Sequence, residues 1–220
     1  MKFIKLSLAA ALVVSVAFAE EKKSDLGVSA NVAMASNYVW RGMTQSADSP
    51  AIQGGIDLDY KGLYVGAWGS NVKFTGSDAS MELDAYAGYK NEIAGIGYNI
   101  GYIQYAYPND SKALNFGEAY IGLSYDFKVV EVSAKYNLGI KTDTIDPENA
   151  YEGGVSVPLP MDISIDATIG NYENTGVYYI AGVSKKIDKF KFTVAYSAMD
   201  YKASTTKTEE NVIATVSASF

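Results

Sequence analysis

The strongest constraint on the fold of this chain is a side-chain alternation with a period of two that recurs along most of its length. In Met81–Lys90 and Val130–Leu138, apolar residues occupy every second position and mostly polar residues fill the positions between them. Successive side chains of a β-strand point to opposite faces, whereas a helix with 3.6 residues per turn does not separate such sets. The chain is therefore predicted to be all-β, with one apolar and one polar face on each strand.

About twelve such segments can be recognised along the chain. They are Val28–Arg41, Ala51–Tyr60, Leu63–Val72, Ser80–Lys90, Ile96–Tyr105, Phe116–Tyr125, Val129–Gly139, Tyr151–Leu159, Asp162–Gly170, Val177–Lys185, Phe190–Asp200 and Asn211–Phe220. Short connections such as Lys61-Gly62 alternate with mostly longer polar ones such as Gly42–Pro50 and Ile140–Ala150. This asymmetry is typical of transmembrane β-barrels. We expect a single antiparallel transmembrane β-barrel with short periplasmic turns and longer extracellular loops.

The last predicted strand ends on an aromatic residue, Phe220. This ending resembles the C-terminal signature of bacterial outer-membrane β-barrels, whose last strand closes the barrel. In those proteins the terminal Phe is recognised by the barrel assembly machinery. The resemblance implies that this machinery is a partner through Phe220, and that lipid of the outer membrane surrounds the barrel.

The first residues have the pattern of a secretory signal peptide. Lys2 and Lys5 precede the apolar run Leu6–Phe18, and the small-x-small tripeptide Ala17–Ala19 precedes Glu20. The run is too short to be a comfortable transmembrane helix. The predicted organisation is a cleaved signal peptide at 1–19, a short lead-in at 20–26 and the barrel at 27–220. Export through the general secretory pathway to the outer membrane follows from it.

Composition excludes several classes of function. The chain contains no His and no Cys, which removes the usual nucleophilic triads and the usual zinc and haem ligands, so no cofactor or metal is predicted. A net charge of −7 argues against nucleic acid as a partner. An enzyme would have to use carboxylate pairs such as Glu82/Asp84. However, positions i and i+2 of a strand simply share a face, which here is the lumen, so we expect solvated lumen charges and no enzyme.

Aromatic residues beside the connections predict two girdles at the membrane interfaces. The predicted girdle residues are Tyr38, Trp40, Tyr151 and Tyr172 near the outer rim, with Tyr60, Tyr64, Tyr89, Tyr98, Tyr125, Phe190 and Phe220 near the periplasmic rim.

The polar phase of the strands predicts the residues that line the lumen. These are Arg41, Gln53, Asp57, Asp59, Glu82, Asp84, Lys90, Glu118, Glu131, Lys135, Glu152, Asp166 and Lys191. Eight acids against four bases give a negative lumen, which favours cations. Arg41 is the only Arg in the chain, and its planar guanidinium suits bidentate pairing with a carboxylate. A salt bridge that fixes the first loop and a contact with solute are both open roles for it.

Three segments carry a more specific resemblance. SNYVWRGMTQS (36–46), PAIQGGID (50–57) and YVGAWGSNV (64–72) resemble the TorF-type family of outer-membrane porins. The resemblance implies location and fold more than a transported solute.

The function expected from these observations is a narrow porin for passive diffusion of small hydrophilic solutes, weakly preferring cations. One alternative is a non-conducting structural or adhesion barrel whose extracellular loops bind a partner; a lumen filled by Trp68, Tyr86 and Tyr120 would favour it. Two others are a His-free barrel enzyme and a secreted lipocalin-like barrel. Twelve strands lie between small filled barrels and wide porins, so we expect transport either to be limited to small solutes or to be blocked by inward side chains.

Overall fold

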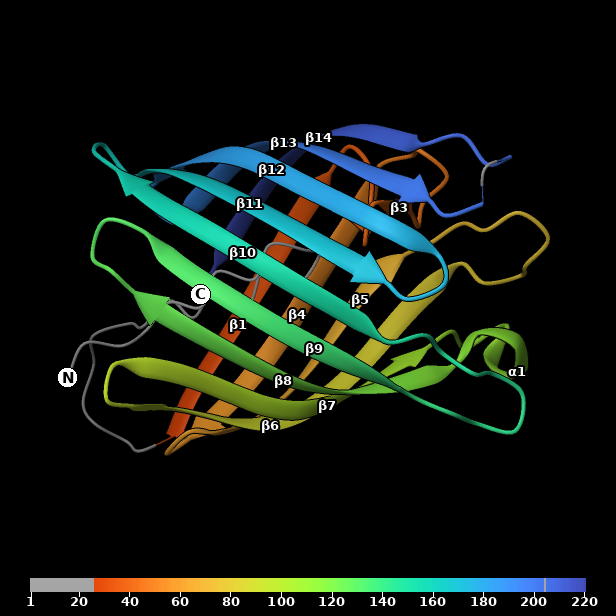
Figure 1. Cartoon of the computed structure of the whole chain (residues 1–220), viewed down its shortest axis with the longest axis horizontal. Helices are drawn as coiled ribbons and strands as arrows, with labels where there is room; N and C mark the ends of the chain where they lie inside the picture. Colours follow the sequence, from red (N-terminus) through yellow and green to blue (C-terminus); the bar gives the residue numbers. More distant parts are fainter. Residues whose placement is uncertain (1–25, 204) are drawn as a thin grey trace.

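The computed structural model describes residues 26–203 and 205–220, and in them the chain forms one closed antiparallel β-barrel of twelve strands (Figure 1). The predicted fold class is confirmed; the predicted signal peptide and residues 20–25 of the lead-in lie outside the described residues. The barrel strands are β1 (Leu26–Ala35), β4 (Ala51–Tyr60), β5 (Leu63–Asn71), β6 (Met81–Ile93), β7 (Ile96–Ala106), β8 (Phe116–Asp126), β9 (Glu131–Ile140), β10 (Ala150–Leu159), β11 (Ile163–Tyr172), β12 (Gly176–Ile187), β13 (Phe190–Tyr201) and β14 (Glu209–Ser219).

The first and last strands close the barrel. β1 pairs with β14 in a register that places Asn31 opposite Ser219 and Ala35 opposite Thr215. Phe220 extends this ladder, because its N–H donates to the Ala30 carbonyl at 2.9 Å and its carbonyl accepts from the Ala30 N–H at 3.1 Å. The C-terminal residue therefore takes part directly in closure.

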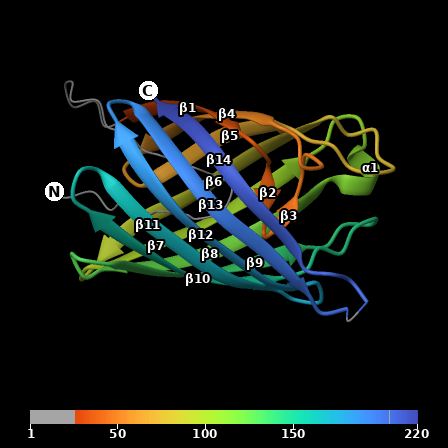
Figure 2. The ribbon, with the colours of Figure 1, turned by 90° about the horizontal axis from the view of Figure 1, so that it is seen from above.

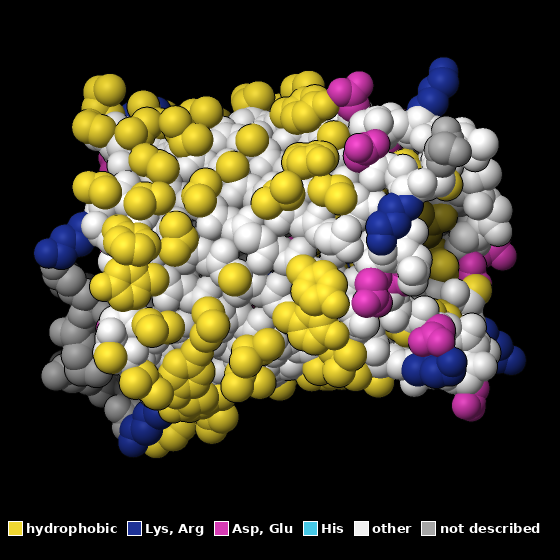
Figure 3. Space-filling model, in the orientation of Figure 1, with side chains coloured by type: hydrophobic (Ala, Val, Ile, Leu, Met, Phe, Trp, Pro, Cys, Tyr) yellow, Lys and Arg dark blue, Asp and Glu magenta, His cyan; other side chains and the backbone are white. Residues whose placement is uncertain are grey.

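Side chains on the barrel alternate between an apolar exterior and a largely polar interior. Val212, Ile52 and Val194 are 71%, 64% and 59% exposed, and the exterior of the barrel is covered with such residues (Figure 3). Monomeric proteins in water rarely expose an apolar surface of this extent, whereas hydrocarbon accommodates it. The inward positions of β6 are instead Glu82 and Asp84. None of the helices in residues 26–203 and 205–220 has the length and apolar character to cross a membrane.

The two ends of the barrel differ. One end, which we call the loop end, carries the long connections and the short helix α1 (Ser111–Leu114) (Figure 1). The other, the turn end, carries only tight connections such as Lys61-Gly62 and Asp188-Lys189. On the face drawn in Figure 3, acidic side chains gather mainly over the loop end. These ends correspond to the predicted alternation of connection lengths.

One predicted strand is wrong in its second half. Instead of running to Arg41, β1 ends at Ala35, and the chain then forms a small hairpin, β2 (Val39–Trp40) and β3 (Met43–Thr44). Arg41 and Gly42, at the tip, have φ angles of 48° and 82°, the signature of a two-residue hairpin turn. A Cβ on Gly42 would lie 2.5 Å from the Ala198 carbonyl oxygen, so the tip packs tightly against β13. The hairpin lies inside the ring of strands at the loop end (Figures 1 and 2).

The apolar exterior yields a test of strand phase. Replacing Val194 with Arg is expected to lower the free energy of unfolding by about 2–4 kcal/mol, because the charge would enter hydrocarbon. The adjacent Thr193 is half-buried on the inward face, so Thr193→Arg is the matched control and should cost much less. Urea unfolding in lipid vesicles measures both. Equal losses would mean that the assigned faces of β13 are incorrect.

Candidate functional site

Many of the buried polar and charged contacts in the barrel involve the segment Ser36–Pro50, which folds into the barrel instead of forming an exposed loop. The prediction that Gly42–Pro50 is an extracellular loop is therefore wrong for most of its length: Gly42 and Ser46 are buried, and only its last few residues reach the surface. The chain bends at Ser36-Asn37 directly after β1, and the turn at Arg41-Gly42 reverses it at the tip of the hairpin.

Short polar side chains hold the base of the hairpin. Asn37 donates to the side-chain oxygen of Asn211 on β14 at 2.8 Å and accepts from Thr44 and Ser46 at 2.7 and 2.9 Å. The Ser46 hydroxyl also accepts from the backbone N–H of Tyr38 at 3.0 Å. These bonds satisfy buried polar groups and fix the hairpin against the last strand.

The tip of the hairpin is fixed by a buried ion pair. Nη1 and Nη2 of Arg41 donate to the two carboxylate oxygens of Glu118 at 2.7 and 2.9 Å, a bidentate arrangement. Arg41 is 2% exposed and Glu118 is fully buried. The guanidinium carbon also lies 4.2 Å from the ring centroid of Trp40 and 4.8 Å from that of Tyr172. Burial alone would lower the pKa of Arg41, but Glu118 raises it above the ordinary value, so the side chain stays charged.

A second pair of charges lies beside the hairpin. Glu82 and Asp84 on β6 are 1% and 3% exposed, so the expectation that they are solvated lumen charges is wrong. Tyr38 donates from its hydroxyl to Glu82 at 2.9 Å. Burial, together with the charge of Glu82, raises the pKa of the Tyr38 and Tyr107 hydroxyls, which keeps both protonated as donors.

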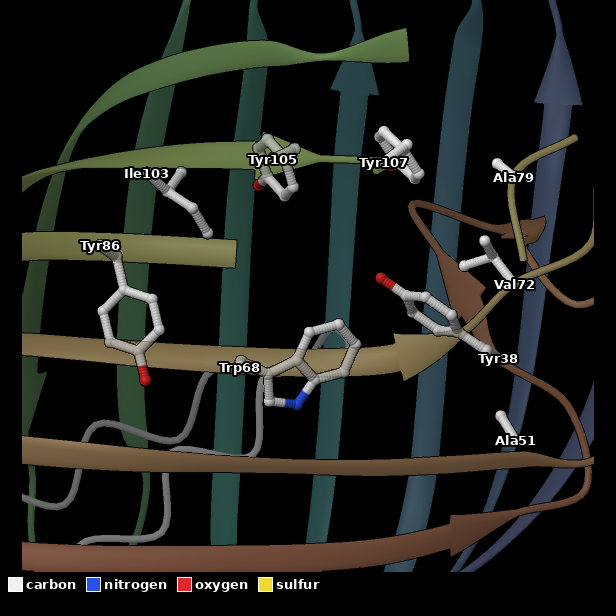
Figure 4. Packing of buried hydrophobic residues seen from close by; sticks show 9 residues of the cluster. All are labelled: Tyr38, Ala51, Trp68, Val72, Ala79, Tyr86, Ile103, Tyr105 and Tyr107. Carbon is white, nitrogen blue, oxygen red and sulfur yellow. The ribbon is translucent and has the colours of Figure 1, made fainter. Parts of the chain in front are cut away.

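Aromatic side chains fill the space around these groups. Figure 4 shows Tyr86, Trp68 and Tyr38 in one row, facing Ile103, Tyr105 and Tyr107 in a second row. Tyr38 meets Trp68 edge-on, with ring centroids 5.5 Å apart. Together with the hairpin, this cluster occupies the lumen toward the loop end (Figure 4).

The remaining predicted lumen residues lie on the strand faces opposite the exposed apolar rows. Asp57 is buried and accepts from the Tyr86 hydroxyl at 2.6 Å. Lys90 and Lys135 lie over the rings of Tyr64 and Tyr120, at 5.5 and 4.9 Å from the centroids. The half-buried members of this set are Gln53, Asp59, Lys90, Glu131, Lys135, Glu152, Asp166 and Lys191. They lie along the whole lumen, whereas Arg41/Glu118 and Glu82/Asp84 are compact groups of buried side chains beside the hairpin.

The predicted girdle divides into two sets. Tyr60, Tyr125, Tyr151, Phe190 and Phe220 are exposed on the exterior, and Tyr89 packs beside Tyr98 with ring centroids 6.1 Å apart. The girdle prediction is wrong for the other four residues, which point into the barrel: Tyr38, Trp40, Tyr64 and Tyr172.

Alternation could have identified two of these four. Tyr172 shares its phase with Asp166, and Tyr64 shares its phase with Trp68. Tyr38 and Trp40 were misplaced because they belong to the inward hairpin and not to β1.

Sequence reasoning also missed several residues of the site. Tyr105 and Tyr107 belong to the aromatic cluster, and Asn137 and Tyr178 are almost completely buried on inward faces. Strand phase was the available signal for Tyr105, Asn137 and Tyr178. Tyr107 shares the phase of Tyr105 but follows the end of β7, where strand alternation no longer defines the direction of a side chain.

With this geometry established, comparison with known proteins places the chain in a family. Residues 19–220 match the model of Gcw_chp, described as a bacterial protein of unknown function. The chain belongs to this family. The TorF-type resemblance is not confirmed by this match, and no curated protein matches the chain significantly.

Solved structures share the architecture of this Gcw_chp protein at low sequence identity. A KdgM porin aligns with a TM-score of 0.62 at 11% identity, covering 87% of this chain and 98% of that one. A NanC porin gives 0.57 at 11% identity, covering 87% and 99%. The outer membrane phospholipase A from Escherichia coli gives 0.52 at 12% identity, covering 87% and 88%. At these identities the likeness shows the fold alone.

The buried ion pair predicts a non-additive stability effect. Arg41→Met should lower the free energy of unfolding by about 3–5 kcal/mol, because it leaves the Glu118 carboxylate buried without a counter-charge. The double variant Arg41→Met/Glu118→Leu should recover much of that loss, since it removes both charges. Urea unfolding of the single and double variants measures the coupling. Additive losses would show that the two side chains do not act as a pair.

Proposed function

We propose that this protein is a narrow outer-membrane channel for small hydrophilic solutes, weakly preferring cations, whose extracellular mouth is closed by the hairpin of its first loop. It would be exported through the general secretory pathway and recognised through Phe220 by the barrel assembly machinery. The observation that carries the proposal is the Arg41–Glu118 pair, which docks a loop segment inside a closed, charged barrel.

The channel part of the proposal rests on the two faces of the barrel. An apolar exterior with exposed aromatic residues fits a bilayer, and a polar lumen fits aqueous solutes. The porin likeness of the fold, seen with KdgM and NanC, is in keeping with this function and with a TorF-type assignment. The excess of acids over bases on the inward faces supports a preference for cations.

The closed mouth follows from how the lumen is filled. The hairpin, the aromatic cluster and two buried charged pairs share the lumen at the loop end. A solute would pass only if the hairpin moves or if the solute is small enough for a very narrow path beside the hairpin. The bidentate bond between Arg41 and Glu118 then acts as the latch of the closed state.

A second candidate function has a specific observation in its favour. Trp68 and Tyr86 are 5% and 7% exposed, so large side chains do fill part of the lumen, and Tyr120 is half-buried beside them. This supports a non-conducting structural barrel whose loops bind a partner. The phospholipase likeness adds no enzymatic candidate, because it shows the fold alone and this chain has no His.

Conductance across planar bilayers tests the channel against the structural barrel. Arg41→Gln removes the latch and one lumen cation, so it should raise single-channel conductance several-fold and strengthen the preference for K⁺ over Cl⁻. The preference should be largest at low salt, because ions screen the lumen charges as salt rises. Lys191→Gln is the matched control: it removes an inward cation near the turn end, away from the hairpin, and should change selectivity without raising conductance.

Two results would contradict the proposal. Anion preference at low salt would overturn the lumen charge assignment. The absence of conductance in both the wild type and Arg41→Gln would favour the structural barrel.

Orientation is tested by labelling intact cells with a membrane-impermeant amine reagent. Lys141 and Lys202 are exposed at the loop end and should react, whereas Lys61 and Lys189 are exposed at the turn end and should react only after lysis. The reason is that the loop end faces the medium in this proposal. Labelling of Lys61 or Lys189 from outside would reverse the orientation.

A further inference from the structure

We infer that Glu82 and Asp84 form a binding site for a hard divalent cation, with Ca²⁺ as the best fit, inside the barrel beside the hairpin. The site lies on β6 and does not involve the Arg41–Glu118 pair. It is a property of the folded barrel and does not require conduction, so it can fail or succeed independently of the channel proposal.

The first argument is that one carboxylate is buried without any hydrogen bond. Asp84 is 3% exposed, and neither of its carboxylate oxygens has a hydrogen-bond partner. Buried polar groups are nearly always hydrogen-bonded, and a buried charge without compensation costs several kcal/mol. Asp84 therefore requires a ligand, which is either a cation or a proton.

The second argument is that the neighbouring carboxylate, Glu82, also has no salt bridge to a basic side chain in the described part of the chain. Glu82 is 1% exposed and accepts hydrogen bonds from the neutral hydroxyls of Tyr38 and Tyr107, which remove no charge, and its carboxyl group lies against that of Asp84. In the described part of the chain, no salt bridge reaches Glu82 or Asp84. Positions i and i+2 on one strand place both carboxylates on the inward face, about 7 Å apart along the backbone.

Other inward acids show what compensation looks like in this barrel. Glu118 has Arg41 at 2.7 Å, and Asp166 accepts from the hydroxyls of Ser156 and Ser164 at 2.6 and 3.0 Å. Glu152 accepts from the Asn137 amide at 3.1 Å. Asp84 departs from this pattern, and it does so next to a second buried carboxylate.

The chemistry of the surroundings selects the ion. The donors are carboxylate oxygens, with the hydroxyl of Tyr38 on Glu82, and the chain offers no His or Cys to a softer metal. Oxygen donors favour Ca²⁺ and Mg²⁺, and Ca²⁺ accepts irregular oxygen geometry at longer distances, whereas Mg²⁺ demands a near-ideal octahedron. One divalent ion neutralises both charges, with water completing its coordination.

The surrounding aromatic residues strengthen the binding of a cation at this site. Tyr38, Trp68, Tyr105 and Tyr107 close around this part of the lumen (Figure 4). Their rings restrict water and lower the local dielectric, which strengthens the attraction between the carboxylates and a cation. They also place Trp and Tyr rings close enough to transfer excitation to a lanthanide in the site.

The test is ion binding to the refolded full-length barrel in detergent, with Ca²⁺ in calorimetry and Tb³⁺ in luminescence excited through Trp and Tyr. We expect one saturable site per barrel, sensitised Tb³⁺ emission that Ca²⁺ displaces, and a higher unfolding temperature with Ca²⁺. Asp84→Asn and Glu82→Gln should each weaken binding on the order of tenfold or more. Asp166→Asn is the matched control, an inward acid already satisfied by serines, and should bind as the wild type does.

Unfolding temperature without Ca²⁺ gives a second readout. Asp84→Asn removes an uncompensated buried charge, so it should be at least as heat-resistant as the wild type without Ca²⁺ and lose the stabilisation by Ca²⁺. Heat-modifiable electrophoretic mobility verifies that each variant folds. If Asp84→Asn does not fold, Glu82→Gln is used in its place for the measurements of binding and unfolding temperature.

Three outcomes would overturn the inference. The first is the absence of saturable binding, and the second is binding by both variants equal to that of the wild type. The third is an infrared band of a protonated carboxylic acid at neutral pH that disappears in Asp84→Asn and does not respond to Ca²⁺. That last result would assign a shared proton to the pair.

Discussion

Every other feature of this molecule depends on complete pairing of the strand edges. In hydrocarbon an unpaired backbone N–H or C=O has no water to bond, so a sheet can cross only if it closes on itself. Here closure depends on the short seam between β1 and β14, which Phe220 extends through its two hydrogen bonds with Ala30. Once the sheet is closed, each strand has one lipid-facing and one lumen-facing side, and the polar residues gather in a confined space.

Confinement determines how the lumen charges behave. Charges on an open surface are screened by solvent, whereas inside this barrel they need specific partners. Arg41 provides one for Glu118, and hydroxyl and amide groups provide others. The hairpin is thus part of the charge balance of the lumen as well as a physical obstruction, and Asp84 is a buried carboxylate that the surrounding protein groups leave without a hydrogen bond.

The sequence predicted the barrel well because its signal is local. Each strand carries its own period of two, and the strand count, the alternating connections and the closing strand follow from it. The site depends on contacts that no local pattern encodes, because Arg41 binds Glu118, 77 positions further along the chain. The hairpin was predicted as a continuation of β1 because the residues before Arg41 also alternate. The sequence showed that Glu82 and Asp84 share a face, but their burial depends on rings from other strands and from the hairpin.

The position of the hairpin also has a consequence for the order of assembly. Its base is held by Asn211, 174 residues further along the chain, and the backbone N–H of Thr44 donates to Glu209 on the same final strand. Contacts of such long sequence separation form late, because the entropy of closing the loop must be overcome first. We therefore expect the base of the hairpin to be fixed only when the last strand joins the first, so that the final seam and the fixing of the hairpin are completed together.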